Sequence, residues 1–256
     1  MHPLPRPRDP LPGTGHQPAS TTPPRSGRAR LAAPVLVREA VAADVPSTAR
    51  LHIEHLPVGL FPRLGHRFVA CWHSAHLDSP HAVALVVDGP SPDGGRCIAG
   101  FLIGALDRHA FQQELLSRYR TRLVVRGAGA LALRPRVLVD FLRTRLRPYL
   151  RHLRTPRPTP SVPPGAVALA PVAELTAVAM APALRRTGSG RRLVDEFVDR
   201  CAAADVRRIE LVTDVGSAGS VDFYRRTGWT ALRRIDTRDG RTVQRFVRWT
   251  EAPKES

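Results

Sequence analysis

Lysine is almost absent from this sequence. Lys254 is the only lysine among 39 lysine and arginine residues, and the formal net charge is +17. Arginine, alanine, proline and glycine are abundant together, as a GC-rich genome produces, so compositional bias can explain the charge. The alternative is a dedicated site for a polyanion, such as a nucleic acid, an anionic lipid or an acidic partner. Composition alone leaves both interpretations open.

Cysteine is also scarce. The three cysteines are widely spaced and form no Cys-x-x-Cys pair: Cys71, Cys97 and Cys201. This pattern argues against a disulfide framework or a zinc site and favours a reducing compartment, so we predict a cytoplasmic protein without a signal peptide. His52/His55 and His73/His76 have the i, i+3 spacing of metal ligands, but no cysteine or carboxylate cluster accompanies them. We therefore expect histidines on helix surfaces and no metal.

No uninterrupted apolar run is long enough to cross a membrane. Residues 165–184 come closest, but Pro171, Glu174 and Pro182 interrupt them. A carboxylate at the centre of a bilayer costs about 2.5–3.5 kcal/mol on insertion scales. We therefore predict buried structure and no membrane span. Residues 1–33, rich in proline and arginine, have too little apolar surface to order themselves and are predicted to be a disordered tail, followed by one domain over residues 34–251 and a short tail over 252–256.

Hydrophobic periodicity and turn residues predict a mixed α/β (α+β) fold with a largely antiparallel N-terminal half. Strands are expected at residues 35–41, 81–87, 97–106, 172–180 and 208–213, and the chain closes in a hairpin with Asp239-Gly240 at its turn. Helices are expected at residues 45–55, 62–77, 190–204 and 217–226. Asp44 is the expected N-cap of the first helix, and Gly228 the left-handed residue that ends the last.

Residues 108–157 interrupt this order with 13 arginines against Glu114 and Asp140. Leucines recur there at helical spacing, at positions 138, 142, 146, 150 and 153, and a proline-rich linker follows over residues 155–165. We interpret residues 108–165 as a helical insertion plus linker between the third and fourth strands. Its arginines could attract an acidic acceptor or a nucleic acid, or the segment could be a solvated cover whose leucines pack on the core.

A glycine turn precedes the helix at residues 190–204. The N-terminus of a helix carries unpaired backbone N–H groups and the positive end of the helix dipole, so it binds anions. Gly188-Ser189-Gly190 lets the backbone approach such an anion closely, and Arg185, Arg186, Arg191 and Arg192 add attraction. A phosphate or pyrophosphate is the natural occupant, and a plain glycine turn is the alternative. A Walker A loop would need a lysine here, and a dinucleotide-binding loop would need glycine at Leu193.

Two segments together resemble the GNAT superfamily of N-acetyltransferases. The family motif V-x-P-x-x-[RQ]-x-x-G-x-[GA] matches Met180-Ala181-Pro182, Arg185, Gly188 and Gly190. The second motif, N-x-x-A-x-x-F-Y-x-x-x-G-F, matches Phe223, Tyr224, Gly228 and Trp229, while Ser217 and Ser220 replace its asparagine and alanine. These two replacements weaken the amide contact that the family makes to its cofactor. The resemblance covers residues 34–249 outside the insertion.

The resemblance implies a central mixed sheet of about seven strands flanked by helices, and acetyl-CoA or another acyl-CoA as cofactor. It implies that the backbone of Val178, Ala179 and Met180 pairs with the pantetheine arm. The turn over Arg185, Arg186, Gly188, Ser189, Gly190 and Arg191 would then hold the pyrophosphate, with Ser217 and Ser220 nearby. The implied reaction is direct transfer of the acyl group to a primary amine of a small molecule or a protein. The competing interpretation is a GNAT-like binding module for nucleic acid or an acidic protein.

The same resemblance suggests roles at the thioester. Tyr224 matches the family's usual acid, and a phenol is protonated at neutral pH and can donate to a departing thiolate; the alternative is a core tyrosine. Glu174 could act as the base through an ordered water, since burial raises a carboxyl pKa, or it could pair with an arginine. Asp107 and His109 are less supported bases. The N–H of Val178 is the implied oxyanion donor. Residues 55–67 and 234–242 usually frame the acceptor site in this fold.

Overall fold

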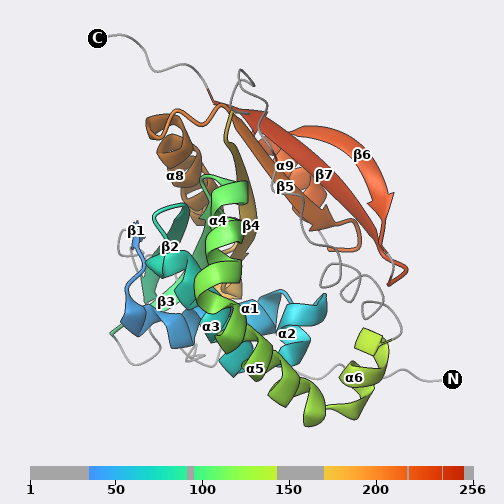
Figure 1. The fold of residues 1–256 in the computed structure, drawn as a ribbon. Helices are drawn as coiled ribbons and strands as arrows, with labels where there is room; N and C mark the ends of the chain where they lie inside the picture. Colours follow the sequence, from blue (N-terminus) through green and yellow to red (C-terminus); the bar gives the residue numbers. More distant parts are fainter. Residues whose placement is uncertain (1–34, 91–94, 143–169, 218, 238, 251–256) are drawn as a thin grey trace, which may run out of the picture. The chain divides into compact units, whose positions relative to one another are not determined.

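The computed structural model describes residues 35–90, 95–142, 170–217, 219–237 and 239–250 (Figure 1). The tails expected at 1–33 and 252–256, the linker at 155–165 and the leucines beyond position 142 lie outside these ranges. Within them, seven strands form one mixed sheet in the order β1-β2-β3-β4-β5-β7-β6. The strands are β1 (Leu36–Glu39), β2 (Ala82–Pro90), β3 (Arg96–Ala105), β4 (Val172–Met180), β5 (Arg208–Asp214), β6 (Thr230–Asp236) and β7 (Thr242–Trp249). Every neighbouring pair is antiparallel except β4 and β5.

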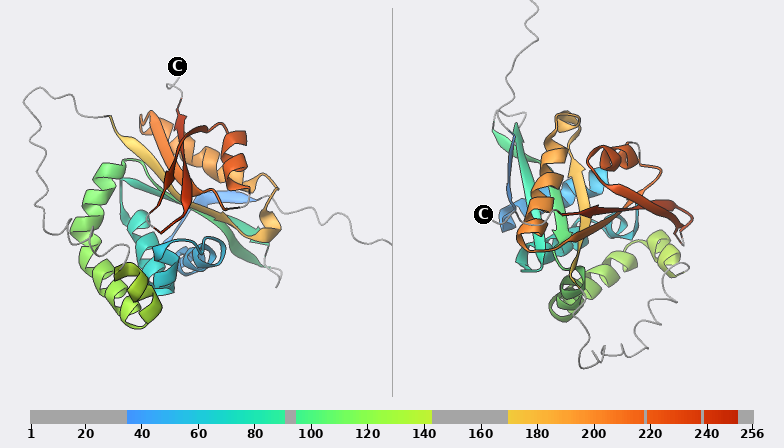
Figure 2. Two further views of the ribbon diagram at one scale, coloured as in Figure 1. Left: turned by 90° about the vertical axis from the view of Figure 1, so that its right-hand side faces the viewer. Right: turned by 90° about the horizontal axis from the view of Figure 1, so that it is seen from above.

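Helices cover both faces of this sheet (Figure 2). One face carries α1 (Val45–His55), α2 (Leu60–Leu64) and α3 (His66–Asp78); the other carries α8 (Ser189–Ala203) and α9 (Ser220–Arg226). The helical spacing of Leu193, Val194, Phe197 and Cys201 buries all four against the sheet, as predicted. Two short 3-10 turns, η1 (Ala42–Asp44) and η4 (Pro182–Leu184), complete this part of the fold. No helix in the described ranges is long and apolar enough to span a bilayer.

Two local predictions near the N-terminus hold only in part: Asp44 is at the N-cap position of α1, and a helix forms in each half of residues 62–77. The helix expected at residues 62–77 is broken into α2 and α3 at Gly65, whose φ of +89° lies in the left-handed region. A Cβ there would come within 2.7 Å of the Arg134 guanidinium, so the space of a side chain is already filled. Asp44 does not cap α1 with its side chain, because its carboxylate accepts from Arg38 (2.7 Å) and from the Val41 backbone N–H (2.8 Å) instead.

The described part of the segment between β3 and β4, interpreted from the sequence as an insertion, is helical. It consists of α4 (Arg108–Glu114), a π-helical turn η2 (Leu115–Tyr119), α5 (Arg120–Ala132) and α6 (Pro135–Phe141). Its polar contacts reach α2 and α3: Tyr119 donates to Asp78 (2.5 Å), Arg134 to the Leu64 carbonyl (3.3 Å), and Arg63 to Asp140 (2.6 Å). The insertion therefore rests on the helices that follow the first strand.

The central strand β4 contains a bulge that exchanges its two faces. Ile103 of β3 pairs with Ala177 and Gly104 pairs with Leu175, so Thr176 has no partner in β3. Before the bulge, Ala173 and Leu175 belong to the core beneath α8; after it, Ala177 and Ala179 belong to the core beneath α1 and α3. In the first half of β4 the buried alternate residues therefore contact the α8 layer, and in the second half they contact the layer of α1 and α3.

Candidate active site

Strands β4 and β5 separate partway along the sheet. Their parallel pairing runs from Val172↔Arg208 to Leu175↔Leu211 and stops, although β4 continues to Met180 and β5 to Asp214. Beyond that point β4 stays paired with β3, and β5 stays paired with β7. The bulge at Thr176 lies where the two strands part. The result is a fork in the sheet, open at the carboxyl ends of its two parallel strands.

The β5-facing edge of β4 is open within the fork. Ala181 donates its N–H to Ala99 of β3 (2.7 Å), and backbone polar groups alternate sides along a strand. The N–H and C=O groups of Val178 and Met180 therefore face the open edge. The Met180 carbonyl accepts from Arg185 Nε (3.1 Å), which ties the turn after β4 to this edge.

The turn from Arg185 to Gly190 presents a run of backbone donors. Arg186 and Gly188 have positive φ angles of 63° and 87°, and α8 begins at Ser189. Among the described residues, the N–H groups of residues 186–191 find no acceptor, although both neighbours of this run do. Consecutive N–H groups in alternating left- and right-handed backbone form a concave anion site, and the helix dipole strengthens it. The anion site predicted for the glycine turn remains a prediction that this run of donors permits.

Two side chains of this turn are engaged in contacts within the protein. Ser189 is buried and its hydroxyl hydrogen-bonds that of Thr187 (2.8 Å), so Ser189 offers a ligand its backbone N–H rather than its hydroxyl. Arg191 bonds Asp195 one helical turn away (3.3 Å). A Cβ on Gly190 would lie 3.5 Å from Met180 Cγ and 3.9 Å from the Phe223 ring. The end of β4, the start of α8 and the face of α9 therefore converge at Gly190.

Helix α9 begins at Ser220 rather than at the predicted Ser217. Gly219, with φ of +77°, turns the chain into the helix. The Ser220 hydroxyl donates to the Ser217 carbonyl (3.0 Å) and accepts from Thr213 (3.1 Å), so it holds the turn between β5 and α9 together. Ser217 lies exposed in that turn.

Tyr224 is buried on α9. Its ring lies edge-on to Phe223 and Trp229 and packs against Phe246 of β7. Burial raises the pKa of its phenol well above the usual value, so the hydroxyl stays protonated at neutral pH. Both interpretations from the sequence, the acid and the core tyrosine, are compatible with a ring fixed in this way.

Glu174 lies on the opposite face of the sheet from α8, one residue before the last pair of β4 and β5. Burial raises the pKa of its carboxyl, and Glu210, its partner in β5, raises it further, while Arg108 opposes both. Among the described residues, no side chain forms an ion pair with Glu174, and Arg108, whose charge lowers its pKa, pairs with Glu210 instead (3.2 Å). Asp107 is engaged as the N-cap of α4, accepting from the His109 N–H (2.8 Å), and the exposed His109 ring bonds Gln113 (3.0 Å).

Residues 160–229, which include β4, the glycine turn, α8, β5 and α9, match the model of the acetyltransferase (GNAT) family. This part of the chain carries a GNAT acetyltransferase domain. No protein with a curated description matches the sequence significantly.

The fold of the whole described chain is also that of GNAT structures. SsHAT shares 18% identity over 85% of this chain and 98% of its own, with a TM-score of 0.54. A phosphinothricin acetyltransferase from Sinorhizobium meliloti in complex with acetyl-CoA shares 15% over 87% and 92% (TM-score 0.50). The yncA protein of Salmonella typhimurium with acetyl-CoA shares 12% over 88% and 98% (TM-score 0.50). At these identities the similarity shows the fold.

Sequence reasoning missed one charged cluster in the GNAT domain. The carboxylate of Glu210 is buried between three guanidinium groups, those of Arg108 (3.2 Å), Arg208 (2.5 Å) and Arg245 (3.1 Å). Burial alone would raise the pKa of Glu210, but these arginines hold it below its usual value. The alternation of Arg208 and Glu210 along β5 is a signal of one charged face, but nothing in the sequence brings Arg108 and Arg245 to it.

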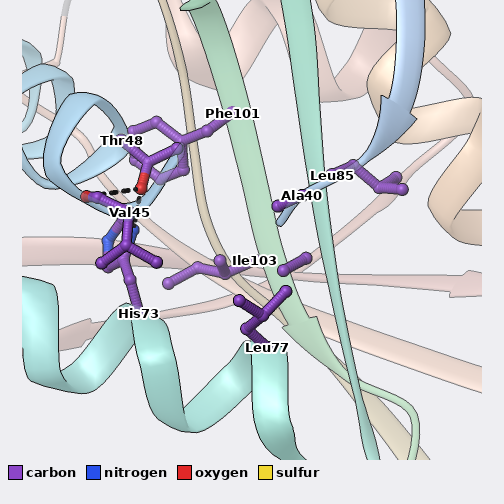
Figure 3. Close-up of a pocket in the computed structure, with 9 residues that line it drawn as sticks. Ala40, Val45, Thr48, His73, Leu77, Leu85, Phe101 and Ile103 are labelled. Atoms are coloured by element: carbon purple, nitrogen blue, oxygen red, sulfur yellow. Dashed lines mark hydrogen bonds between the residues drawn. The ribbon is translucent and has the colours of Figure 1, made fainter. Parts of the chain in front are cut away.

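Three of the four histidines expected on helix surfaces are in the core, and the fourth, His55, is half-buried. His52 of α1 and His73 and His76 of α3 are all buried. The Thr48 hydroxyl donates to the Val45 carbonyl (3.1 Å), so it accepts from His73 Nδ1 (2.9 Å), and His73 Nε2 in turn accepts from His52 Nδ1 (3.1 Å). This chain of hydrogen bonds requires neutral rings, and burial, which lowers the pKa of both histidines, keeps them neutral at pH 7. Thr48 and His73 line a cavity of about 10 Å³ beside Phe101 and Ile103 (Figure 3), too small for a cofactor. No group of three or more metal-binding side chains occurs in the described ranges.

These buried histidines predict a protein that loses stability in mild acid. Burial lowers the pKa of His52 and His76 to about 4 and that of His73 to about 2, whereas an unfolded histidine titrates near 6.5. Well above pH 6.5 these histidines are neutral in both the folded and the unfolded state, so their burial then carries no cost of protonation. As pH falls below 6.5, the unfolded state takes up protons first, and each histidine then costs about 1.4 kcal/mol per pH unit until its folded pKa is reached.

Urea unfolding at pH 7.5, 6.0 and 5.0 measures this loss. Replacing His76 with leucine should reduce the slope by about one third, because one of three buried titrating groups is removed. Replacing the exposed His109 with leucine is the control and should leave the slope unchanged. Equal unfolding free energies at pH 7.5 and 5.0 would contradict the neutral assignment.

Proposed function

We propose that this GNAT domain transfers an acetyl group from acetyl-CoA to a primary amine, by direct attack with both substrates bound. The observation that carries the proposal is the fork between β4 and β5, whose open β4 edge leads directly into a turn where six consecutive N–H groups find no acceptor in the described part of the chain. A ligand suited to both must carry amide groups along one part and an anion at the next. Acetyl-CoA has this order, with pantetheine amides followed by a pyrophosphate.

The described residues fit such a ligand. Val178 and Met180 offer backbone donors and acceptors at the strand edge, in the manner of an added strand. The backbone of Arg186, Gly188 and Gly190 offers donors for phosphate oxygens. Ser217 and Ser220 contribute less than the resemblance implies, because the Ser220 hydroxyl is used within the turn. Another acyl-CoA would satisfy the same contacts.

Tyr224 is proposed as the acid. When bound, acetyl-CoA supplies the acetyl group as a thioester, whose thiol has a pKa near 8.5 once released. A protonated donor near the sulfur therefore assists its departure. Tyr224 keeps its proton, and its ring is fixed by Phe223, Trp229 and Phe246, so the hydroxyl is held in one place. The Val178 N–H on the open edge is the proposed donor to the carbonyl oxygen.

Glu174 is proposed as the base. An acceptor amine must lose a proton before it attacks, and a buried carboxyl with a raised pKa is better matched to that task than an exposed one. Glu174 lies at the base of the fork, on the face of the sheet away from α8. The acceptor would therefore enter from the side of α1–α3 and the insertion, opposite the phosphate-binding turn.

Thermal and chemical unfolding with acetyl-CoA tests the proposal. At 100 times its dissociation constant, acetyl-CoA should add about 2.7 kcal/mol to the unfolding free energy. ATP at the same concentration is the control for general attraction of phosphates to this basic chain. The absence of any shift, or an equal shift with ATP, would contradict the assignment of the fork. Acetyl-CoA binding without CoA release for any amine would favour the binding-module alternative.

A further inference from the structure

The three arginines around Glu210 carry more positive charge and more N–H donors than one carboxylate can balance. Arg108 and Arg245 both contact the same oxygen, Glu210 Oε2, while Arg208 contacts Oε1. Arg208 is further held over the Trp249 ring (5.8 Å). Each guanidinium has five N–H donors and carries a full charge, so one carboxylate leaves both positive charge and donor capacity unused. Arg208 Nε is itself buried without an acceptor among the described residues.

The cluster lies on the acceptor side of the fork. Glu210 is the partner of Glu174, one residue before β4 and β5 separate. Arg245 pairs with Val212, the next residue of β5 on that face, and Val212 is 53% exposed. Arg108 opens α4 at the end of β3, with 41% of its side chain exposed. Among the described residues, each of these two guanidinium groups hydrogen-bonds only Glu210. Donors therefore remain on the sheet face that carries Glu174, opposite the turn proposed for the pyrophosphate.

We propose that Arg108 and Arg245 bind a carboxylate of the acceptor, so that the acceptor is a small primary amine carrying a carboxylate. The inference rests on the proposed acetyltransferase function. Arg–carboxylate contacts are charge-assisted and bidentate where geometry permits, which orients a ligand as well as attracting it. With its carboxylate on the two arginines, the amine of a short amino acid would point along the same face toward Glu174.

Matched acceptor pairs test this assignment. Glycine, β-alanine, 4-aminobutyrate and glutamate are each compared with the corresponding carboxamide, using CoA release from acetyl-CoA. The carboxamide keeps the amine and removes the charge. Replacing the carboxylate by a carboxamide also lowers the pKa of the amine. A larger fraction of the amide is then unprotonated at neutral pH, so the amine pKa alone would favour the amide as the acceptor. At least one acid should therefore be preferred over its amide by about tenfold or more in kcat/KM.

Two variants connect the preference to the site. Arg245→Gln and Arg108→Gln should each lower the acid-to-amide ratio of kcat/KM by about tenfold, mainly through the KM of the acid. The ratio is compared because the charge of Arg108 also lowers the pKa of Glu174, the proposed base, and its loss affects both acceptors alike. Each leaves Glu210 paired with two arginines, so the fold should be retained. Arg200→Gln is the matched control. The Arg200 side chain is 41% exposed, as that of Arg108 is, but it lies on α8, where it forms ion pairs with Glu196 of α8 and Glu39 of β1.

Binding of the acceptor in the presence of CoA distinguishes a failure of the carboxylate site from a failure of the proposed acetyltransferase function. The preferred acid should raise the unfolding temperature of the CoA-bound protein, and its amide should not. If acetyl-CoA binds but no acid of the panel does, or if the acids and amides react equally, the carboxylate site is wrong and the acetyltransferase function stands. If the two arginine variants keep the full preference for the acid, the site is also wrong. If acetyl-CoA itself does not bind, both proposals are wrong.

Discussion

Replacing Tyr224 with phenylalanine is expected to lower kcat by about 10²–10⁴-fold and to leave the affinity for acetyl-CoA unchanged. Only the hydroxyl is lost, and the ring keeps its contacts with Phe223, Trp229 and Phe246. A general acid acts in the transition state, so its loss should appear in kcat and kcat/KM equally. Single-turnover CoA release and calorimetric titration of acetyl-CoA measure the two quantities.

Tyr119 offers the matched control for this substitution. It is also buried, and its hydroxyl donates to Asp78 where the insertion meets α3, away from the fork. Tyr119→Phe should therefore lower stability by the net value of one hydrogen bond, about 1 kcal/mol, without a comparable change in kcat. Equal turnover of Tyr224→Phe and the parent protein would assign Tyr224 to packing.

Gly190→Asp is expected to weaken acetyl-CoA binding by at least about 100-fold without unfolding the protein. A carboxylate beside the free N–H groups of residues 186–191 would accept from them itself and repel the pyrophosphate, and such like-charge contacts cost several kcal/mol. The Cβ has room, since its nearest neighbours are Met180 Cγ at 3.5 Å and Phe223 at 3.9 Å. An acidic residue in the first turn of α8 also interacts favourably with the helix dipole.

Binding and stability should thus change in opposite directions in this variant. Calorimetric titration and urea unfolding of the same preparation test both. Gly190→Ala separates the bulk of the Cβ from the charge, and Gly129→Asp, at a site in α5 with open space, controls for added negative charge. Unchanged acetyl-CoA affinity in Gly190→Asp would remove the pyrophosphate from this turn.

The sequence predicted most of the parts that hold the proposed cofactor. Strand β4 has the bounds expected for it, and the glycine turn leads into α8 as predicted. These features are local: turn chemistry, helical spacing and flanking prolines determine them over a few residues. The resemblance to the GNAT superfamily rests on the same two segments, and the family model covers them.

What the sequence did not show depends on contacts between distant residues. The bulge at Thr176 exists only in relation to the pairing of β3, and no residue type marks it. His73 and His76 have the spacing of a helix surface, but α1 and the sheet cover that surface. Glu210 gathers Arg108 from 102 positions away and Arg245 from 35. Periodicity identifies which residues share a face and cannot identify what covers it.

The bulge at Thr176 also has a consequence for how this domain can evolve. Leu175 and Ala177 are two positions apart in the chain, yet they belong to cores on opposite sides of the sheet. Substitutions with no shared contacts combine additively, whereas substitutions in one core depend on each other. The two ends of β4 can therefore accumulate changes almost independently. The layer under α8 can be conserved for the cofactor while the layer under α1 and α3 diversifies with the acceptor.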